Sequence, residues 1–399
     1  MSAGDQAIFK QTALGSLPVD WDVVPLNEIC WFQEGPGLRK WQFTSRGMKV
    51  INVTNLTGEI LDLDKTDRHI SLSEFNDQYQ HFAVDANDIV MASSGNSYGK
   101  IALVRECDLP LMMNTSVIRF KPKERTCFSY AWTFLRSDFF KSQIDLMITG
   151  GAQPNFGPYH LNKVLVQLPP LSEQMSISDA LTDQDKIIGS LDQLIAKKRN
   201  IQQATMQQLL TGKRRLPGFS GGWEEASLGE ISYISKGEQL SQRGDAAGLI
   251  PHFNGGVSAS SYTDTANTPE DTIAISEGGN SCGFVQFITT PFWCGGHCYA
   301  VRPRGIENLF LYFALKGKQD RIMGLRVGSG LPNIQKSALN SFKIALPSCR
   351  YEQTAIATIL ADMDSELAAL EARRDKAHQL RQGMMQELLT GRIRLRHGN

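Results

Sequence analysis

The sequence predicts an α+β protein made of two copies of one unit, in which each globular domain is followed by a long helix and the two helices pack as an antiparallel coiled coil. An eleven-residue phrase at 206–216, MQQLLTGKRRL, recurs as MQELLTGRIRL at 385–395. A stripe of apolar residues at helical spacing precedes each copy. The chain of 399 residues also exceeds the roughly 250 to 300 residues that one hydrophobic core organises.

The repeat extends along the whole chain. Glu173-Gln174 recurs as Glu352-Gln353 at the same displacement as the eleven-residue phrase, and Pro154-Asn155 recurs as Pro332-Asn333. Farther upstream, GNSYG at 95–99 matches GNSCG at 279–283, and LPVDW near the start matches LPGFSGGW after the first phrase. The displacement changes only between motifs, as loops of unequal length would require, so the chain consists of two related units.

The tail of each unit is predicted to be a long amphipathic helix. Apolar residues recur in the first tail with gaps of 4, 7, 3 and 4, which is typical of a coiled-coil seam. The 39 residues from Glu173 to Thr211 would form a rod of roughly 58 Å, with Gly212 and Gly391 at the positions of C-terminal caps. One core-facing helix of a bundle would show the same stripe, but the near-identical copy favours a paired helix. The predicted seam residues are Ile177, Leu181, Ile188, Leu191, Ile195, Ile356, Leu360, Met363, Leu367 and Leu370.

The globular parts are predicted to be mixed sheet and helix. Short β-branched segments bounded by Gly, Asn, Asp or Pro indicate strands at 100–107, 114–122, 163–168, 297–303 and 342–347. Helix is expected around 128–146 and 308–323, which gives an α+β domain. The boundaries that follow are 1–170 for the first domain, 171–212 for the first helix, 213–348 for the second domain, and 349–399 for the second helix and tail.

Composition narrows the class of protein. Lys and Arg together number 41, as do Asp and Glu, so the formal net charge is zero and any nucleic-acid binding must rest on local patches. No apolar run approaches the length of a membrane span, and the amino end lacks the apolar core of a secretory signal. We therefore expect a cytoplasmic protein whose seven scattered cysteines are reduced thiols.

No catalytic or metal site is predicted. The run SSGNSYGKI at 93–101 fails as a phosphate-binding loop, because three residues separate its glycines and Ile101 follows the lysine. Cys294, His297 and Cys298 have ligand chemistry suited to zinc but no second ligand pair, so strand packing is favoured. Cys282 is expected to be a small core residue, while His160 and His252 are placed in polar loops as contact residues.

The arrangement resembles the specificity subunit of type I restriction-modification enzymes. Each half carries an LP start followed by Trp, a G-x-x-x-G turn, a Pro-Asn segment and a long helix that ends in LLTG. The most specific phrase is LPPLSEQ at 168–174, and LPSCRYEQ at 346–353 is a looser copy with one inserted residue. The resemblance covers essentially the whole chain.

The resemblance implies a noncatalytic DNA reader that serves in phage defence. In that family each variable domain is a target recognition domain that reads one half of a bipartite, asymmetric site in double-stranded DNA. Two modification subunits, which hold S-adenosylmethionine and methylate adenine at N6, dock on the helices, and two restriction subunits use ATP and Mg for translocation and cleavage. Cofactors are thus expected in the partner subunits and none in this chain. The helices would set the gap between half-sites, which lie about one DNA turn, ~34 to 36 Å, apart.

Candidate DNA contacts are polar side chains on loops able to enter the major groove or reach phosphates. The alternative is that these loops serve only as hairpin turns and that Trp41, in the first of them, is a core residue. The first domain offers Arg39, Lys40, Ser94, Asn96, Tyr98, Lys100, Asn155, Tyr159 and His160, and the second offers Lys236, Gln239, Gln242, Arg243, Asn280, Ser281, Asn333, Gln335 and Lys336.

Two further interpretations concern the basic helix ends and the overall function. The basic ends KRR at 213–215 and RIRLR at 392–396 are interpreted as solvated helix ends that complement the helix dipole, with phosphate or partner contact as the alternative. The alternative for the whole chain is a coiled-coil scaffold that binds polypeptides without reading DNA sequence. A third hypothesis is that the chain once belonged to a fused restriction-methylation polypeptide, although no catalytic domain is predicted.

Overall fold

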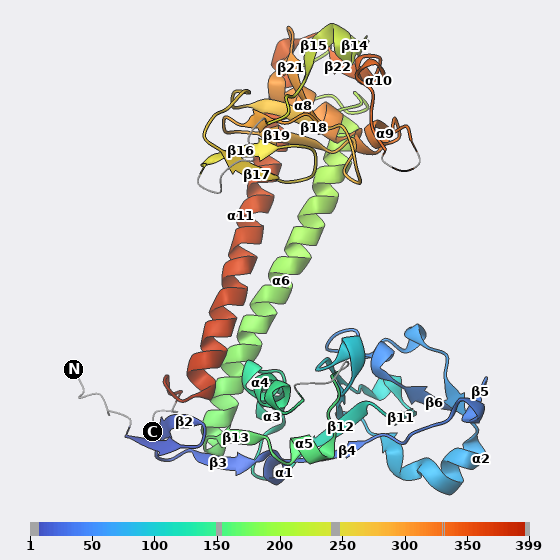
Figure 1. The fold of residues 1–399 in the computed structure, drawn as a ribbon, viewed down its shortest axis with the longest axis vertical. Coiled ribbons are helices and arrows are strands. Elements are labelled where there is room, and N and C mark those ends of the chain that lie inside the picture. The colour runs from blue at the N-terminus through green and yellow to red at the C-terminus, as the bar shows by residue number, and fades with distance from the viewer. Residues whose placement is uncertain (1–7, 149–153, 241–247, 329, 331, 396–399) are drawn as a thin grey trace. The chain divides into compact units, whose positions relative to one another are not determined.

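The computed structural model describes residues 8–148, 154–240, 248–328, 330 and 332–395. The chain forms two compact units, Met1–Gly189 with Asp375–Asn399, and Ser190–Arg374. Figure 1 shows the elements in chain order. Each long helix contributes one stretch to each unit, so both units contain a globular part and a section of the helix pair.

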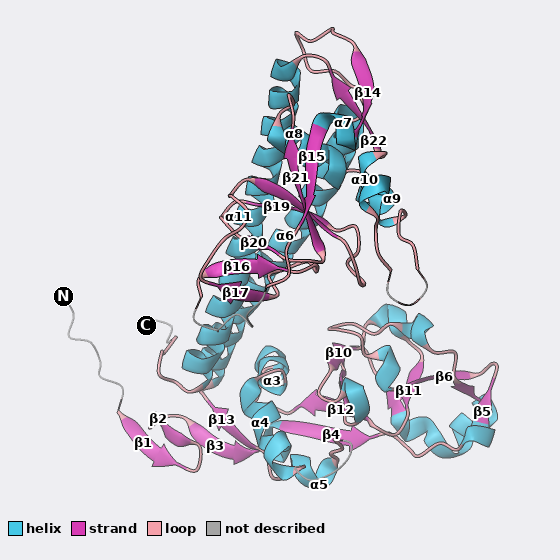
Figure 2. Ribbon diagram, turned by 45° about the horizontal axis from the view of Figure 1, so that its top comes forward, coloured by secondary structure: helices cyan, strands magenta, loops and turns pink. Residues whose placement is uncertain are grey.

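The globular part of the first unit combines small sheets with helices (Figure 2). Strand β3 (Asp22–Pro25) pairs with β13 (Leu165–Leu168), and a four-stranded sheet has the order β10 (Ile101–Leu103), β9 (Ile89–Ala92), β12 (Val117–Pro122), β4 (Cys30–Glu34). Helices α3 (Phe128–Leu135) and α4 (Asp138–Met147) pack on its core, where Tyr130, Phe134 and Phe156 are buried.

A five-stranded sheet in the first unit was not anticipated from the sequence. Its order is β5 (Phe43–Thr44), β7 (His69–Ile70), β6 (Met48–Ile51), β11 (Leu111–Met113), β8 (Ala83–Val84). The first unit also has a hairpin of β1 (Phe9–Thr12) and β2 (Gly15–Pro18), and short helices α1 (Leu26–Ile29), α2 (Leu72–Glu74) and α5 (Pro158–Leu161). The sheet brings strands between residues 43 and 84 together with β11, which lies later in the chain.

The second unit repeats the central topology. Strand β14 (Trp223–Ser227) pairs with β22 (Lys343–Pro347), and β15 (Ser232–Lys236), β21 (Cys298–Pro303), β18 (Thr272–Ser276) and β19 (Val285–Ile288) form the counterpart of β4, β12, β9 and β10 in the same order. A smaller sheet joins β17 (Ser261–Thr263), β16 (Ile250–Phe253) and β20 (Trp293–Cys294). Helices α7 (Leu228–Ile231), α8 (Asn308–Lys316), α9 (Gln319–Met323) and α10 (Lys336–Asn340) complete it.

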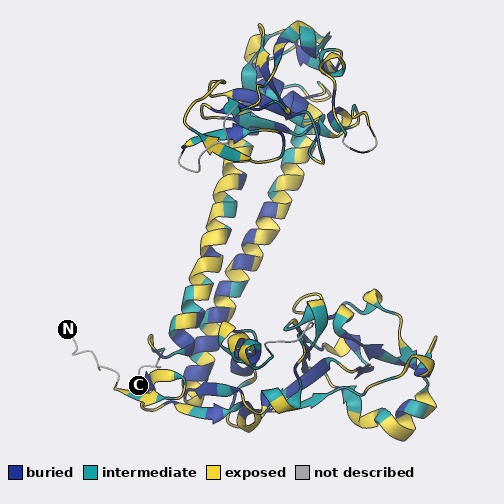
Figure 3. Ribbon diagram, viewed as in Figure 1, coloured by how far each residue is buried: buried dark blue, intermediate teal, exposed yellow. Residues whose placement is uncertain are grey.

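The two long helices, α6 (Leu171–Leu209) and α11 (Arg350–Leu389), pack as the predicted antiparallel coiled coil. In the first unit Gln184 donates to the Ala377 carbonyl and Arg381 pairs with Asp185, and in the second unit Lys198 pairs with Glu366. Residue numbers thus rise along one helix as they fall along the other. Figure 3 shows buried positions recurring among exposed ones on both helices. Of the ten predicted seam residues, all are buried except Met363 and Leu370, which are half-buried.

Both helices end as the sequence predicts. Gly212 and Gly391 each adopt φ of +67°, the left-handed conformation that glycine tolerates best at a C-terminal cap. Space matters as well, because a Cβ at Gly212 would lie 3.0 Å from the Trp223 ring and a Cβ at Gly391 would lie 2.5 Å from Pro18. The phrase LLTG therefore ends α6 against the start of the second globular part and α11 against the start of the first.

The placement of His252 in a polar loop is wrong. His252 lies in β16 with 8% of its surface exposed, and its Nδ1 is 2.8 Å from the Ser261 hydroxyl across the strand pair. Burial lowers the pKa of this imidazole. Cys282, Cys294 and Cys298 are buried free thiols, and no cluster of metal-ligating side chains occurs within the described ranges. Over those same ranges, no helix is long and apolar enough to cross a membrane.

Candidate nucleic-acid interface

In the first unit the structure brings together two of the predicted DNA-contact loops. The GNSYG turn and the Pro-Asn segment form a β-bridge between Ser94 and Asn155. The Gly95 amide donates to the Pro154 carbonyl at 3.2 Å, and the Phe156 amide donates to the Ser93 carbonyl at 3.0 Å. Backbone hydrogen bonds thus hold the two loops side by side as one surface feature.

The second unit builds the same feature from its own copies of the motifs. Gly278 and Asn333 form the bridge, the Gly279 amide donates to the Pro332 carbonyl at 3.0 Å, and the Ile334 amide donates to the Glu277 carbonyl at 2.9 Å. The two repeats share Gly, Asn and Ser in the turn and Pro and Asn in the facing segment, and both adopt the same backbone arrangement. We call each such pair of joined segments a loop cluster.

Most of the predicted contact residues present their side chains to solvent. Ser94, Tyr98, His160 and Ser281 are half-buried, whereas Gln242 and Arg243 lie outside the described residues. Two contacts fix the Tyr98 side chain: its hydroxyl donates to Asp145 at 2.7 Å, and its ring packs edge-on against Phe156. The exposed candidates are Arg39, Lys40, Asn96, Lys100, Asn155, Tyr159, Lys236, Gln239, Asn280, Asn333, Gln335 and Lys336.

The loop that contains Trp41 is anchored from beneath while its indole faces water. Trp41 is 80% exposed, so the alternative that it is a core residue is wrong. Its neighbour Gln42 is buried, accepts a hydrogen bond from the Arg39 amide at 2.7 Å and donates to the Tyr79 hydroxyl at 3.0 Å. The anchored Gln42 leaves Arg39, Lys40 and Trp41 together on the surface.

Two residues that the sequence did not single out organise these surfaces. Lys163 donates to the Tyr159 hydroxyl at 2.7 Å and stands over its ring, which lowers the pKa of Tyr159. Glu277, at the first position of the second loop cluster, accepts from Lys236 Nζ at 2.7 Å and from the Tyr299 hydroxyl at 2.9 Å. Glu277 could have been identified from the sequence, because it lies just before the repeated glycine turn.

Two arginines of the basic helix ends, Arg215 and Arg394, are not free solvated cations, which corrects the expectation for them, whereas Lys213, Arg214 and Arg392 are exposed as expected. In the first unit Arg394 binds both carboxylate oxygens of Glu173 at 2.6 Å, and Trp21 Nε1 donates to the same carboxylate at 3.0 Å. In the second unit Arg215 binds both oxygens of Glu352, at 2.6 and 2.7 Å. Each arginine therefore ties one helix end to the start of the other helix, and we call each pair a helix-end clasp.

The repeated glutamines that follow those glutamates, Gln174 and Gln353, make equivalent hydrogen bonds in the two units. Gln174 donates to the Pro169 carbonyl at 2.9 Å and accepts from the Cys127 amide at 3.0 Å. Gln353 donates to the Pro347 carbonyl at 2.9 Å and accepts from the Glu307 amide at 2.9 Å. Each glutamine thereby joins the start of a long helix to the segment that begins α3 or α8, which explains why Glu-Gln recurs in both copies.

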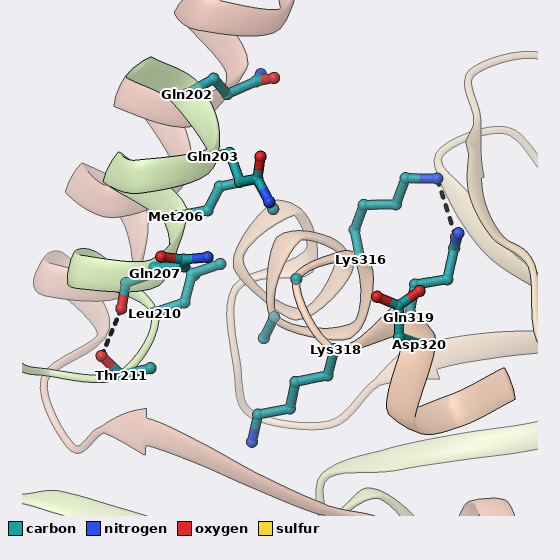
Figure 4. Close-up of a pocket in the computed structure, with 12 residues that line it drawn as sticks. Gln202, Gln203, Met206, Gln207, Leu210, Thr211, Lys316, Lys318, Gln319 and Asp320 are labelled. Carbon is teal, nitrogen blue, oxygen red and sulfur yellow. Dashed lines mark hydrogen bonds between the residues drawn. The ribbon is translucent and has the colours of Figure 1, made fainter. Parts of the chain in front are cut away.

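The repeat also creates a surface cleft in each unit, where a long helix meets the corner between two short ones. In the second unit a cleft of about 420 Å³ lies between the end of α6 and the α8–α9 corner, and Figure 4 shows Gln203, Met206 and Gln207 facing that corner. In the first unit a cleft of about 320 Å³ lies between α11 and the α3–α4 corner, lined by the repeat-equivalent residues Gln382, Met385 and Gln386. We call these the paired clefts.

Each cleft has a basic side chain at the equivalent corner. Lys316, at the edge of the second-unit cleft, is half-buried and donates to the Val285 carbonyl and to Gln319 at 3.0 Å each. Desolvation lowers the pKa of its ammonium group. The corresponding place in the first unit is taken by Arg136, which ion-pairs with Glu59 and stands over the Trp132 ring. A basic side chain therefore marks the same corner in both clefts.

The sequence of the chain is similar to those of known proteins. A Mycoplasma genitalium protein described as a type I specificity subunit is 36% identical over 152 residues, which are 37% of this chain and 39% of that protein. The specificity subunit of the type I restriction enzyme MjaVIII from Methanocaldococcus jannaschii is 27% identical over 53% of this chain and 50% of its own. The chain thus aligns with half or less of the length of these relatives.

A solved structure extends the likeness in fold to nearly the whole chain. The S subunit of the type I restriction-modification system from M. genitalium superposes with a TM-score of 0.63 at 19% identity, covering 92% of this chain and 96% of that one. The profile of the type I restriction modification DNA specificity domain matches residues 18–198 and again 220–378. The chain therefore belongs to the type I restriction-modification DNA specificity family, with two copies of the family domain.

Proposed function

We propose that this chain is the noncatalytic, sequence-reading subunit of a type I restriction-modification complex and acts in the cytoplasm. Recognition domains at 1–170 and 213–348 each read one half of a bipartite, asymmetric site in double-stranded DNA. The observation that carries the proposal is the duplicated loop cluster, in which one backbone arrangement carries the same asparagines in both units but different residues beside them. Ser94, Tyr98 and Lys100 of the first unit are replaced by Gly278, Cys282 and Phe284 in the second. A common frame with different side chains is what reading two different half-sites requires.

The neutral charge of the chain is consistent with a reader that works inside a larger complex. Phosphate contacts supply most of the salt-dependent affinity of DNA-binding proteins. With a formal net charge of zero, this chain would rely on partner subunits to neutralise much of the phosphate charge. Its own exposed Lys, Asn and Gln side chains on the loop clusters are then available for base edges.

The partners in this proposal are two modification subunits, and through them two restriction subunits. The modification subunits would hold S-adenosylmethionine and methylate adenine, and the restriction subunits would use ATP and Mg. Support comes from the paired clefts, because two surfaces of equivalent lining, one in each unit, suit two copies of one partner. The exposed faces of α6 and α11 beside those clefts extend the surface available for docking.

Selection from a random DNA pool tests the proposal in vitro. The chain is purified with its cognate modification subunit, the bound DNA is sequenced, and the modification subunit alone serves as the control. Two short conserved blocks at a fixed separation, enriched only when this chain is present, are expected. A stable protein complex that enriches no sequence would contradict the proposal and favour the scaffold alternative.

A further inference from the structure

The first strand of each four-stranded sheet, β4 or β15, ends on a different charge in the two units. Glu34 is the last residue of β4 and Lys236 is the last residue of β15. The residues that follow them are equivalent, because the Gly35 amide donates to the Val117 carbonyl at 3.0 Å and the Gly237 amide donates to the Cys298 carbonyl at 2.9 Å. One structural position therefore carries a carboxylate in the first unit and an ammonium group in the second.

In the second unit the surroundings satisfy the charge of Lys236. Its ammonium group lies 2.7 Å from Glu277, whose side chain is 12% exposed and also accepts from the Tyr299 hydroxyl at 2.9 Å. His297 Nδ1 lies 3.8 Å from the same carboxylate. Lys236 is thus held in place while half of its side chain still faces solvent.

In the first unit the residues equivalent to those partners carry no charge. The Ser93 amide donates to the Ser116 carbonyl at 2.8 Å, as the Glu277 amide donates to the His297 carbonyl at 2.9 Å, so Ser93 and Ser116 replace Glu277 and His297. Within the described ranges, no basic side chain lies within ion-pair distance of the half-buried Glu34. Burial raises the pKa of the Glu34 carboxyl, and a hydrogen bond from the Ser116 backbone opposes that shift in part.

The carboxylate of Glu34 lies against the first loop cluster. A Cβ built on Gly157 would lie 3.3 Å from Glu34 Oε2, so the absence of a side chain at Gly157 makes room for the carboxylate. Gly157 directly precedes α5, which carries the exposed Tyr159, and its amide donates to His160 Nδ1 at 3.2 Å. Glu34 is thereby placed among the candidate DNA contacts of the first unit.

We propose that Glu34 reads a cytosine in the first half-site by accepting a hydrogen bond from its exocyclic N4 amino group. An ionised carboxylate only accepts hydrogen bonds, and phosphates would repel it, so the DNA group that suits it is a base amino group. In the major groove the cytosine edge offers the N4 donor alone, whereas adenine places the N7 acceptor beside its N6 donor. A carboxylate therefore fits cytosine better than adenine. This inference rests on the proposed function.

The substitution Glu34→Gln tests the proposal. A glutamine keeps an acceptor for the Ser116 amide, so the local structure should persist, and it adds a donor that matches the N6 and N7 pattern of adenine. We expect one base pair of the first half-site to lose its preference for cytosine and gain tolerance for adenine, by about tenfold in relative methylation. The second half-site should be unchanged, so it serves as a control within the same molecule.

Lys236→Gln is the matched control, since it alters the equivalent position of the second unit and should affect the second half-site alone. Gly157→Ala, which crowds the carboxylate, is expected to weaken the preference at the same base pair as Glu34→Gln. The proposal is overturned if Glu34→Gln leaves every base preference unchanged. It is also overturned if the substitution lowers methylation by the same factor at every site, whichever base occupies the position, as loss of a purely structural residue would. Failure of the wild-type chain to specify any split motif would instead refute the proposed function.

Discussion

Arg394 and Glu173 meet through two hydrogen bonds of 2.6 Å although 221 residues separate them in sequence, and Arg215 and Glu352 repeat that contact in the second unit. All four residues lie in the phrases that identify the repeat. The side chains of Glu173 and Glu352 are 3% and 0% exposed, so each carboxylate depends on its arginine for charge compensation. The repeated phrases thus encode the two ends of the same ion pair.

Arg394→Ala should destabilise the first unit by about 2 to 4 kcal/mol, since removing one partner of a largely buried pair leaves the other charge uncompensated. Arg392→Ala is the control, because the Arg392 side chain is 61% exposed and its loss should cost less than about 0.5 kcal/mol. Hydrogen exchange at the last turn of α11, together with the urea midpoint, would measure both effects. Equal effects of the two substitutions would show that the clasp contributes little.

Filling the paired clefts should remove the modification subunits one at a time. Gln203 and Gln382 are exposed, repeat-equivalent residues that line the second and first cleft, so tryptophan at either position should obstruct a cleft without disturbing the core. We expect Gln203→Trp and Gln382→Trp each to reduce the complex from two modification subunits to one, and the double variant to bind none. Native mass spectrometry counts the subunits, and unchanged stoichiometry in the double variant would exclude the clefts as docking surfaces.

Lengthening both helices should change the gap between half-sites and leave the half-sites themselves unchanged. One heptad inserted after Gly189 in α6 and another after Arg374 in α11 keep the seam in register. Seven residues add roughly 10.5 Å of helix, which corresponds to about three base pairs of DNA at ~3.4 Å each. Sequencing of methylated sites reads the gap directly, and an unchanged gap would count against the helices as the spacer.

The buried His252 should make the second unit less stable in acid. Burial lowers the pKa of its imidazole in the folded state, so below the unfolded value of about 6.5 the unfolded chain binds the extra proton more readily. Stability from this residue is therefore present above that pH and declines as the pH falls. His252→Gln should flatten the pH dependence of the unfolding midpoint between pH 7.5 and 5. A pH dependence identical to that of the wild-type chain would show that His252 does not titrate on unfolding.

The long helices and the repeat could be predicted from sequence because periodic apolar residues and duplicated phrases are local signals. Eight of ten predicted seam residues are buried, and both glycine caps have the expected conformation. The loop clusters were identified as separate loops, but only the fold shows that Ser94 lies beside Asn155. Periodicity could not reveal the Arg394–Glu173 contact, although finding both residues in repeated phrases was a usable signal.

Other features depended on tertiary packing that no local pattern encodes. The five-stranded sheet of the first unit is made of strands of two to four residues, which are too short for alternation to be recognised. His252 was assigned to a polar loop, and the turn residues Asn254, Gly255 and Gly256 do follow it, yet pairing of β16 with β17 and β20 buries it. No sequence pattern identified Glu34 as a candidate contact, because its equivalence with Lys236 follows from the pairing of β4 with β12 and of β15 with β21.

Methylome sequencing of a methylation-deficient host tests the central claim most directly. The host carries the cognate modification subunit with or without this chain, and N6-methyladenine is mapped across the genome. We predict a new methylated motif of two different half-sites around a fixed gap, present only when this chain is expressed. The absence of any new motif, despite a purified complex of the two proteins, would contradict the assignment of this chain as the sequence reader.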